Sequence, residues 1–228
     1  MCKKVVFPRK PPADFIYDPP DTALDIIYND DDILVLSKPA ELLSVPGRKE
    51  EHKDSLETRV KCEFPEARIV HRLDMSTSGI IVMAMNAESH RNIGLQFERR
   101  KTKKVYIARV WGDIEENTGE IDLPLICDWP NRPLQMVDHE NGRSSQTNWE
   151  VIDREVGLTR VALYPITGRT HQLRVHMAEI GHPILGDDFY AHEQAFKAEN
   201  RLHLHAHKLM IHHPDDGRQI WFESKCPF

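Results

Sequence analysis

The chain has 228 residues, of which 40% are hydrophobic, and its net charge of −6 by itself argues against a nucleic-acid partner. This length allows one substantial core, and no apolar run approaches the roughly 18 residues of a membrane-spanning helix, so we expect a soluble, cytoplasmic protein without a membrane partner. The four cysteines are widely separated and form no C-x-x-C motif, which argues against a disulfide framework or a thiolate zinc site.

The first half of the chain predicts an extended arm followed by strands and two helices. In chain order we expect a proline-rich arm over 1–22, a β-hairpin over 23–39 that turns at 29–31, a helix over 54–64 with Asp54 as its N-cap, a strand over 80–85, and a helix over 87–101 capped by Asn86. The second helix places Arg91 and the basic residues 99–101 on its exposed side.

The second half predicts mostly strands. In chain order we expect a strand over 104–112 with Tyr106, Ala108 and Val110 on one face, a hairpin signal at Asn141-Gly142 within 136–152, a strand over 158–165, a helix within 167–181 that ends at Gly181, and strands within 201–213 and over 219–223. Tight turns between strands and the absence of regular βαβ alternation predict an α+β fold with mostly antiparallel, mixed sheets and flanking helices.

The charges are unevenly distributed along the chain. Residues 11–37 carry seven aspartates and no lysine or arginine, whereas residues 91–109 carry seven basic residues and one acid, Glu98. A charge run is usually only a solvated face. The basic segment becomes a candidate polyanion site if the chemistry nearby requires one.

The stretch HRLDMSTSG, residues 71–79, places one carboxylate, Asp74, before an apolar strand. A loop aspartate commonly bonds only the amides of its own turn. The alternative is that the hydroxyls of residues 76–78 and the flexible Gly79 shape a close-fitting loop, in which a fixed, ionised carboxylate can act as a nucleophile or base.

Two further segments are rich in groups capable of chemistry. His203, His205 and His207 alternate on a predicted strand, and we expect a histidine ladder rather than a metal site, because side chains on one strand face diverge. In PITGRTHQLRVHM, Arg169 and Thr170 begin a predicted helix. Its Arg174 is either a surface cation or the permanent partner of a buried acid.

Four stretches in this order resemble the RluA-type pseudouridine synthases. They are ILVLSKPAELLSVPG, HRLDMSTSG, KVYIARVWG and PITGRTHQLRVHMAEIGHPILGD, and the resemblance covers about residues 24–223. The stretches LLSVPGRKEEHKDS and DLPLICDWPNRP resemble one subgroup of that family. The resemblance implies a pseudouridine synthase fold with a central RNA-binding cleft, in one catalytic domain over 23–228. The arm over 1–22 is too short for the S4-type RNA-binding domain of larger relatives.

The resemblance also implies roles for individual residues. Asp74 is the catalytic carboxylate, Tyr106 stacks on the uracil ring and helps the final proton loss, and Arg174 forms an ion pair with Asp74. Arg72 enters the RNA helix where the flipped uridine was. The residues expected to bind RNA are His71, Arg72, Arg99, Arg100, Lys103, Arg169, Thr170 and Gln172.

The substrates that the resemblance implies are stem-loop RNAs, namely the tRNA anticodon stem-loop and a stem-loop of 23S ribosomal RNA. No metal and no organic cofactor are expected, and the protein is expected to be a monomer. Three alternatives stay open: a pseudouridine synthase with a different RNA target, a non-catalytic RNA-binding protein, and a metal-dependent hydrolase built on the three histidines.

Overall fold

The computed structural model describes residues 16–228, which form two compact units. We call them the Asp74 unit, residues 16–105 and 205–228, and the Arg174 unit, residues 106–204. Most of the predicted arm lies outside the described residues, and residues 16–22 contain no helix or strand. The single domain over 23–228 stays a prediction, and each unit is described by itself.

The strands of the Asp74 unit pair mainly antiparallel. They are β1 (Ile26–Asn29), β2 (Ile33–Lys38), β3 (Arg68–Ile69), β4 (Ser78–Ala84), β11 (Leu204–His212) and β12 (Gln219–Glu223). The pairs β1–β2, β2–β4, β3–β4 and β11–β12 are antiparallel, whereas β4 and β11 are parallel. The predicted hairpin over 23–39 and strand over 219–223 are confirmed.

Apolar residues cover both faces of this sheet. Successive apolar side chains of β2 and β4 point alternately to one face and to the other. Ile33 and Val35 pack on the same side as Ile93 of helix α2 (Ala87–Glu98). Leu34 and Leu36 pack on the other side, with helix α1 (Leu56–Glu63). This period of two is what a strand buried on both faces requires. A short 3₁₀ helix, η1 (Glu50–His52), precedes α1.

The N-caps of the two helices show one correct prediction and one error. Asn86 caps α2 as predicted, its side chain accepting the Ser89 amide at 2.8 Å. Ser55 and not Asp54 caps α1, since its hydroxyl accepts the Thr58 amide at 3.2 Å. The Asp54 carboxylate instead forms a two-bond ion pair with Arg59.

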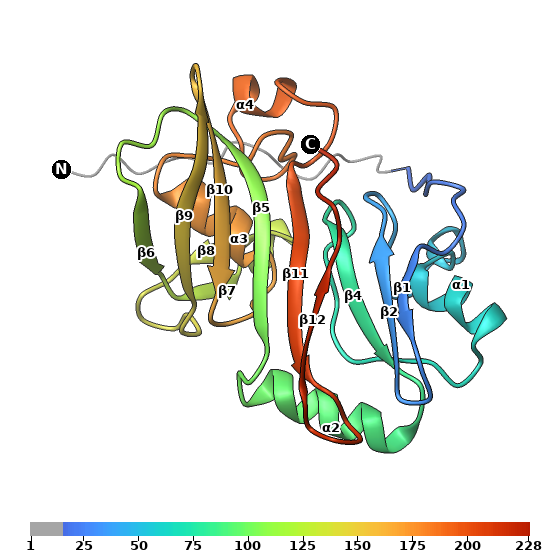
Figure 1. The fold of residues 1–228 in the computed structure, drawn as a ribbon. Helices are drawn as coiled ribbons and strands as arrows, with labels where there is room; N and C mark the ends of the chain where they lie inside the picture. Colours follow the sequence, from blue (N-terminus) through green and yellow to red (C-terminus); the bar gives the residue numbers. More distant parts are fainter. Residues whose placement is uncertain (1–15) are drawn as a thin grey trace. The chain divides into compact units, whose positions relative to one another are not determined.

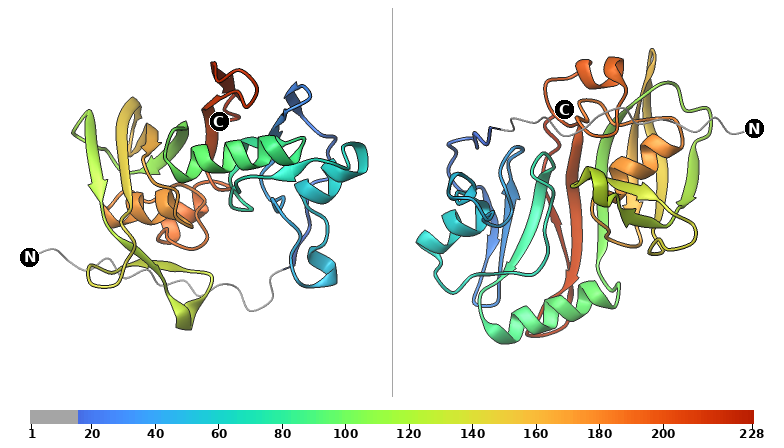
Figure 2. Two further views of the ribbon diagram at one scale, coloured as in Figure 1. Left: turned by 90° about the horizontal axis from the view of Figure 1, so that it is seen from below. Right: turned by 180° about the vertical axis from the view of Figure 1, so that it is seen from behind.

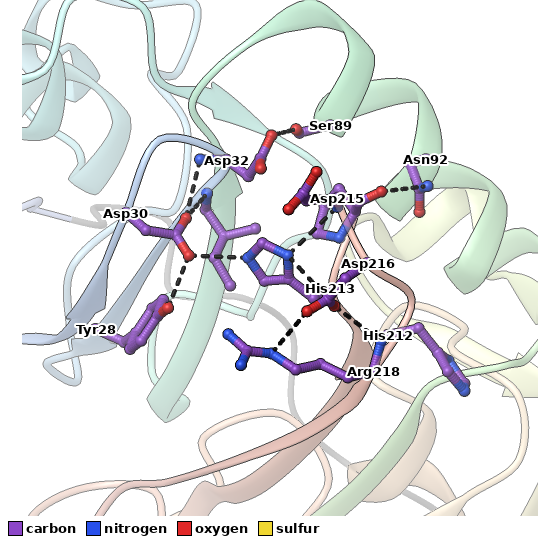
Figure 3. A network of polar contacts seen from close by, with 12 residues as sticks. Tyr28, Asp30, Asp32, Ser89, Asn92, His212, His213, Asp215, Asp216 and Arg218 are labelled. Atoms are coloured by element: carbon purple, nitrogen blue, oxygen red, sulfur yellow. Dashed lines mark hydrogen bonds and ion pairs between the residues drawn. The ribbon is translucent and has the colours of Figure 1, made fainter.

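A polar network ties the β1–β2 turn to the β11–β12 turn (Figure 3). The Asp30 carboxylate accepts hydrogen bonds from the Tyr28 hydroxyl, the amides of Asp32 and Ile33, and the His213 ring, at 2.7 to 2.9 Å. Burial alone would raise the pKa of Asp30, but these donors outweigh it and lower the pKa to about 2. The ionised carboxylate therefore joins the two turns.

The Arg174 unit contains a four-stranded antiparallel sheet and a separate two-stranded one. The larger sheet has the order β5 (Lys103–Trp111), β10 (Leu158–Pro165), β9 (Gln146–Glu155) and β6 (Thr118–Asp122). The smaller sheet pairs β7 (Leu125–Cys127) with β8 (Gln135–Val137), and the 3₁₀ helix η2 (Trp129–Asn131) connects them. A short helix, α4 (Glu193–Lys197), follows later in the chain. The unit boundaries fall inside β5 and β11.

Helix α3 (Gln172–Glu179) lies between the two sheets of this unit (Figures 1 and 2). Leu173 and Met177 face the larger sheet, packing with Ala108 and Val110 of β5. Val175 and Ala178 face the smaller one. Tyr106 also packs against the first cluster, so the predicted inward face of the 104–112 strand is confirmed.

The helix end at Gly181 is confirmed, whereas the hairpin at Asn141-Gly142 is wrong. Gly181 has φ +93°, and its amide bonds the Ala178 carbonyl, as a helix C-terminus requires. Gly142 does close a turn with Asp138 at 3.0 Å. The flanking strands do not pair with each other, because β8 pairs with β7 and β9 pairs with β6 and β10.

Candidate active site

The predicted site residues are distributed over both units. The Asp74 unit contains His71, Arg72, Asp74, Arg99, Arg100 and Lys103. The Arg174 unit contains Tyr106, Arg169, Thr170, Gln172 and Arg174. Asp74 is half-buried in the loop between β3 and β4.

A buried lysine holds this loop at its backbone. The Lys38 side chain is fully buried, and its ammonium group donates to the carbonyls of Met75 (2.9 Å), Leu42 (2.7 Å) and Pro39 (2.8 Å). These bonds use the three donors of the ammonium group and join two loops to the end of β2. The carboxylate of Asp74 is therefore carried by a backbone with little freedom.

Ser44 fixes the residue that precedes Asp74. Its hydroxyl donates to the Leu73 carbonyl at 2.7 Å and accepts the Leu73 amide at 3.1 Å, and both residues are buried. The Thr77 amide then bonds the Asp74 carbonyl at 3.2 Å and closes the turn. Backbone bonds on both sides of Asp74 thus hold the backbone from which its carboxylate extends.

The contacts of Ser78 and Gly79, at the end of the HRLDMSTSG motif, account for serine and glycine at these positions. Gly79 has φ +112°, and a Cβ there would lie 2.2 Å from the Ala206 carbonyl oxygen of β11. Only glycine permits this backbone and this contact. The Ser78 hydroxyl lies 2.9 Å from His205 Nδ1, whose ring also lies 3.2 Å from the Ser224 carbonyl. The loop therefore enters β4 at a fixed register.

His71 is part of the fold as well as of the motif. Its Nε2 accepts the Val82 amide at 3.0 Å, and its ring stacks on Phe97 with centroids 4.5 Å apart. Burial, together with the positive charge of Lys104, lowers the pKa of His71 to about 3. The ring is therefore neutral, and its contact with RNA stays a prediction.

Exposed basic residues follow α2, and another lies in the loop before Asp74. The exposed basic residues are Arg72, Arg99, Arg100, Lys101 and Lys103. Within residues 16–228 none of these side chains forms an ion pair. The helix ends at Glu98, so residues 99–101 follow it instead of forming its last turn, and Arg100 has a left-handed φ of 56°. Burial and the nearby Arg100 charge lower the pKa of Lys104 to about 8. The segment has the unneutralised positive charge that a polyanion site needs.

In the Arg174 unit, Gln172 organises the loop before α3. Its Oε1 accepts the Thr167 hydroxyl at 2.7 Å and the Arg169 amide at 3.0 Å, and its Nε2 donates to the Gln146 carbonyl and the Thr147 hydroxyl. Gln172 is buried, whereas Thr170 is exposed and Arg169 half-buried. The RNA contacts predicted for these three residues stay predictions.

Arg174 is buried and pairs with two acids that the sequence analysis missed. Its Nε and Nη2 donate to the two oxygens of Asp187 at 2.8 and 2.6 Å, and Nη2 also donates to Asp188 at 2.8 Å. Burial favours a raised pKa for Asp187, but Arg174 and the amides of Phe189 and Tyr190 outweigh it and lower the pKa. The reading of Arg174 as a surface cation is thus wrong, and its pair with Asp74 stays a prediction.

Tyr106 lies on β5, opposite Leu163 of β10, and is half-buried against the core of its unit. Its packing places it on the face shared with Ala108 and Val110. Its stacking on uracil stays a prediction.

His205 and His207 of β11, and His203 just before this strand, are held by protein groups. His205 bonds Ser78 and Ser224, His207 Nδ1 lies 2.7 Å from the Ser224 carbonyl, and His203 Nε2 lies 3.4 Å from Glu199. Within residues 16–228, no three His, Cys, Asp or Glu side chains are grouped so that they could hold a metal ion. In the same part of the chain, no helix combines the length and apolar composition needed to cross a membrane.

Four residues that support the site were not predicted from the sequence, namely Lys38, Ser44, Asp187 and Tyr190. Lys38 and Ser44 lie in the ILVLSKPAELLSVPG stretch, and a lysine that ends an otherwise apolar strand was the available signal. Asp187 and Asp188 are adjacent acids in LGDD, shortly after the predicted helix, and this proximity was the available signal. Their contact with Arg174 depends on the fold of the loop after α3.

Comparisons with known proteins identify the family of the chain. The family model described as RNA pseudouridylate synthase matches residues 32–179. The dual-specificity RNA pseudouridine synthase RluA of Yersinia pestis is 55% identical over 204 residues, covering 89% of this chain and 99% of the relative. The protein of the same name from Escherichia coli (strain K12) is 53% identical over 214 residues, covering 93% and 98%.

Solved structures agree as well. Human RNA pseudouridylate synthase domain containing 1 matches with a TM-score of 0.77 and 29% identity, over 92% of this chain and 87% of that one. Human RNA pseudouridylate synthase domain containing 4 has a TM-score of 0.72 at 21% identity, over 89% and 88%, and shows the fold alone. The predicted α+β pseudouridine synthase fold is thereby confirmed. Sequence, family model and fold together place the chain in the RNA pseudouridylate synthase family, as an isomerase that converts uridine in RNA to pseudouridine.

Proposed function

We propose that the enzyme has two RNA substrates, the anticodon stem-loop of tRNA, modified at uridine 32, and a stem-loop of 23S ribosomal RNA, modified at uridine 746. The observation that carries this proposal is the likeness to RluA proteins named for dual specificity, at 51–55% identity over most of the chain. The enzyme acts as a monomer in the cytoplasm, where both RNAs are found, and serves tRNA and rRNA processing.

In the proposed reaction, Asp74 is the catalytic carboxylate. The bond between uracil N1 and ribose C1′ breaks, the base rotates, C5 bonds to C1′, and the C5 proton is lost while N1 gains one. No water is consumed, so the second carboxylate of a glycosidase has no role here. The fixed backbone around Asp74, held by Lys38 and Ser44, supports this assignment, because a preorganised charge needs no rearrangement during the reaction.

The other residues hold the RNA and the flipped base. Tyr106 stacks on the uracil and its hydroxyl assists the loss of the C5 proton, while Arg174 pairs with Asp74. Arg72 fills the space left by the flipped nucleotide. The residues proposed to contact RNA are His71, Arg72, Arg99, Arg100, Lys103, Arg169, Thr170 and Gln172. Flipping costs a few kcal/mol and least where the base is loosely stacked, which favours loop uridines.

The test uses the purified protein and the two stem-loops made with 5-tritiated uridine. Each RNA is paired with a control in which the target uridine is replaced by cytidine. We expect tritium release and one mapped pseudouridine from both native stem-loops and none from the controls. Modification of only one stem-loop, or at another uridine, would contradict the dual specificity while leaving the enzyme class intact.

A further inference from the structure

The tip of the β7–β8 hairpin presents an exposed aromatic side chain stacked on an arginine. Trp129 is 64% exposed, and the guanidinium carbon of Arg132 lies 3.6 Å from the centre of its ring. Figure 2 shows that this hairpin stands apart from the four-stranded sheet, on the other side of α3. A large apolar ring left outside every core of the unit is the kind of surface that binds a partner.

Hydrogen bonds within the tip hold the backbone that carries Trp129 and Arg132. The Asp128 amide bonds the Leu134 carbonyl at 2.9 Å, and the Leu134 amide bonds the Asn131 carbonyl at 3.1 Å. The Asn131 side chain donates to the Asp128 carboxylate at 2.9 Å. A preorganised pair loses less conformational entropy when a ligand binds.

The hairpin is anchored, where β8 begins next to the tip, to the loop that holds Arg174. The Tyr190 hydroxyl accepts the Gln135 amide of β8 at 2.9 Å, and the Tyr190 amide donates to Asp187 at 3.0 Å. Asp187 is the carboxylate paired with Arg174. One loop therefore fixes the Trp129 tip and Arg174 with respect to each other inside the unit.

We propose that Trp129 and Arg132 form a stacking platform for an unpaired base of the substrate RNA, a base other than the uridine that is isomerised. A planar indole with a cation on one face can take a nucleobase on the other, and every base has a face to stack. The arginine charge favours the adjoining phosphate. The proposal rests on the proposed stem-loop substrates and assigns a role to DLPLICDWPNRP, which the catalytic residues leave unexplained.

The experiment compares Trp129→Ala and Trp129→Phe with Trp221→Ala. Trp221 is the matched control, because it is 50% exposed but belongs to β12 of the Asp74 unit. Dissociation constants are measured for the tRNA anticodon stem-loop and for a fully paired duplex of the same length. We expect Trp129→Ala to weaken stem-loop binding roughly 5- to 100-fold, as expected for loss of one stacked base. Trp129→Phe should retain most of the affinity, and Trp221→Ala should bind like the wild type.

The duplex has no unpaired base, so its affinity should be the same for all variants. Wild-type stem-loop affinity in Trp129→Ala, or an equal loss for stem-loop and duplex, would overturn the platform. A change in sedimentation of Trp129→Ala without a change in RNA affinity would overturn it too, because the tip would then be a contact between copies. Binding is measured apart from isomerisation. A wild-type protein that binds the stem-loop without modifying it would contradict the proposed targets and leave the platform standing.

Discussion

Arg174 and Asp187 form a two-bond ion pair in which both side chains are shielded from solvent, at 2% and 0% exposure. The same carboxylate accepts the amides of Phe189 and Tyr190 at 2.9 and 3.0 Å. Asp187 thus holds the arginine of α3 and the turn of the following loop together. Removing its charge would leave a buried cation without its main counter-charge.

Asp187→Asn should therefore lower the free energy of unfolding by about 3–5 kcal/mol, the cost of breaking a buried ion pair from one side. Urea unfolding measures this change. Asp188→Asn is the matched control: it removes a carboxylate bonded to the same Nη2, but Asp188 is 39% exposed. Its effect should stay below about 1 kcal/mol. Equal losses in the two variants would show that Asp187 has no special role.

Local sequence predicts the elements of this fold better than their partners. The β1–β2 hairpin, the Asn86 cap and the bounds of β10 and β12 depend on neighbouring residues, and they are confirmed. Asn141-Gly142 also forms a turn. Which strands pair beyond that turn depends on the β7–β8 sheet and on β10, which the turn residues cannot specify.

The candidate site shows the same division. The HRLDMSTSG motif identified the loop of Asp74, and alternation placed Tyr106 on the inner face of its strand. The lysine that holds the loop and the acid that holds Arg174 act across 37 and 13 residues of sequence. Such contacts depend on how the chain packs. A single sequence therefore indicates acidic and basic residues that could be buried, but it does not indicate which acid contacts which base.

Asp74→Asn should abolish isomerisation and leave folding and RNA affinity close to those of the wild type. The substitution keeps the shape of the half-buried side chain and deletes its charge. Tritium release from 5-tritiated uridine measures the activity, and Asp25→Asn, at an exposed acid of the same unit, is the control. Release near the wild-type rate by Asp74→Asn would remove it from the catalytic role.

Tyr106→Phe should keep its stacking and its place in the core, because only the hydroxyl is lost. We expect RNA to bind normally and turnover to fall, with the slow step at proton removal from C5. Single-turnover assays with 5-deuterated uridine measure this: a larger isotope effect than in the wild type is expected. A variant that turns over as fast as the wild type would leave only the stacking role.

The lowered pKa of His71 predicts that the stability of the folded protein depends on pH. The pKa of His71 is about 3 in the folded protein, against 6.5 for an ordinary histidine, so the unfolded chain takes up the proton first as the pH falls. The stabilisation is complete above pH 6.5 and is lost between pH 6.5 and about 3. His71→Gln should destabilise the protein at pH 7.5, and this difference should shrink by about 1 to 2 kcal/mol at pH 5.

Urea unfolding at the two pH values measures the His71 effect. His139→Gln, which replaces an exposed histidine, is the control and should show no such change. A penalty for His71→Gln that is the same at pH 7.5 and pH 5 would mean that the folded protein accommodates the protonated ring.

The basic segment after α2 predicts how a protein of net charge −6 holds RNA. If Arg99, Arg100 and Lys103 contact phosphates, each contact releases condensed counterions, and log affinity falls with log salt by about 0.7 to 0.9 per contact. Replacing all three with glutamine should weaken binding to target and non-target stem-loops alike and flatten the salt slope by two or three contacts. Phosphates carry no sequence information, so discrimination should not change.

Two controls separate this effect from general loss of charge. Lys197→Gln removes an exposed cation that is already paired with Glu193, and it should leave the salt slope unchanged. Arg72→Gln should reduce turnover and discrimination between stem-loops, because its proposed position lies inside the opened stem. The measurement is RNA affinity as a function of salt concentration. An unchanged salt slope in the triple variant would mean that residues 99–103 are only a solvated segment at the end of the helix. The loop of Arg169 would then be the main phosphate contact.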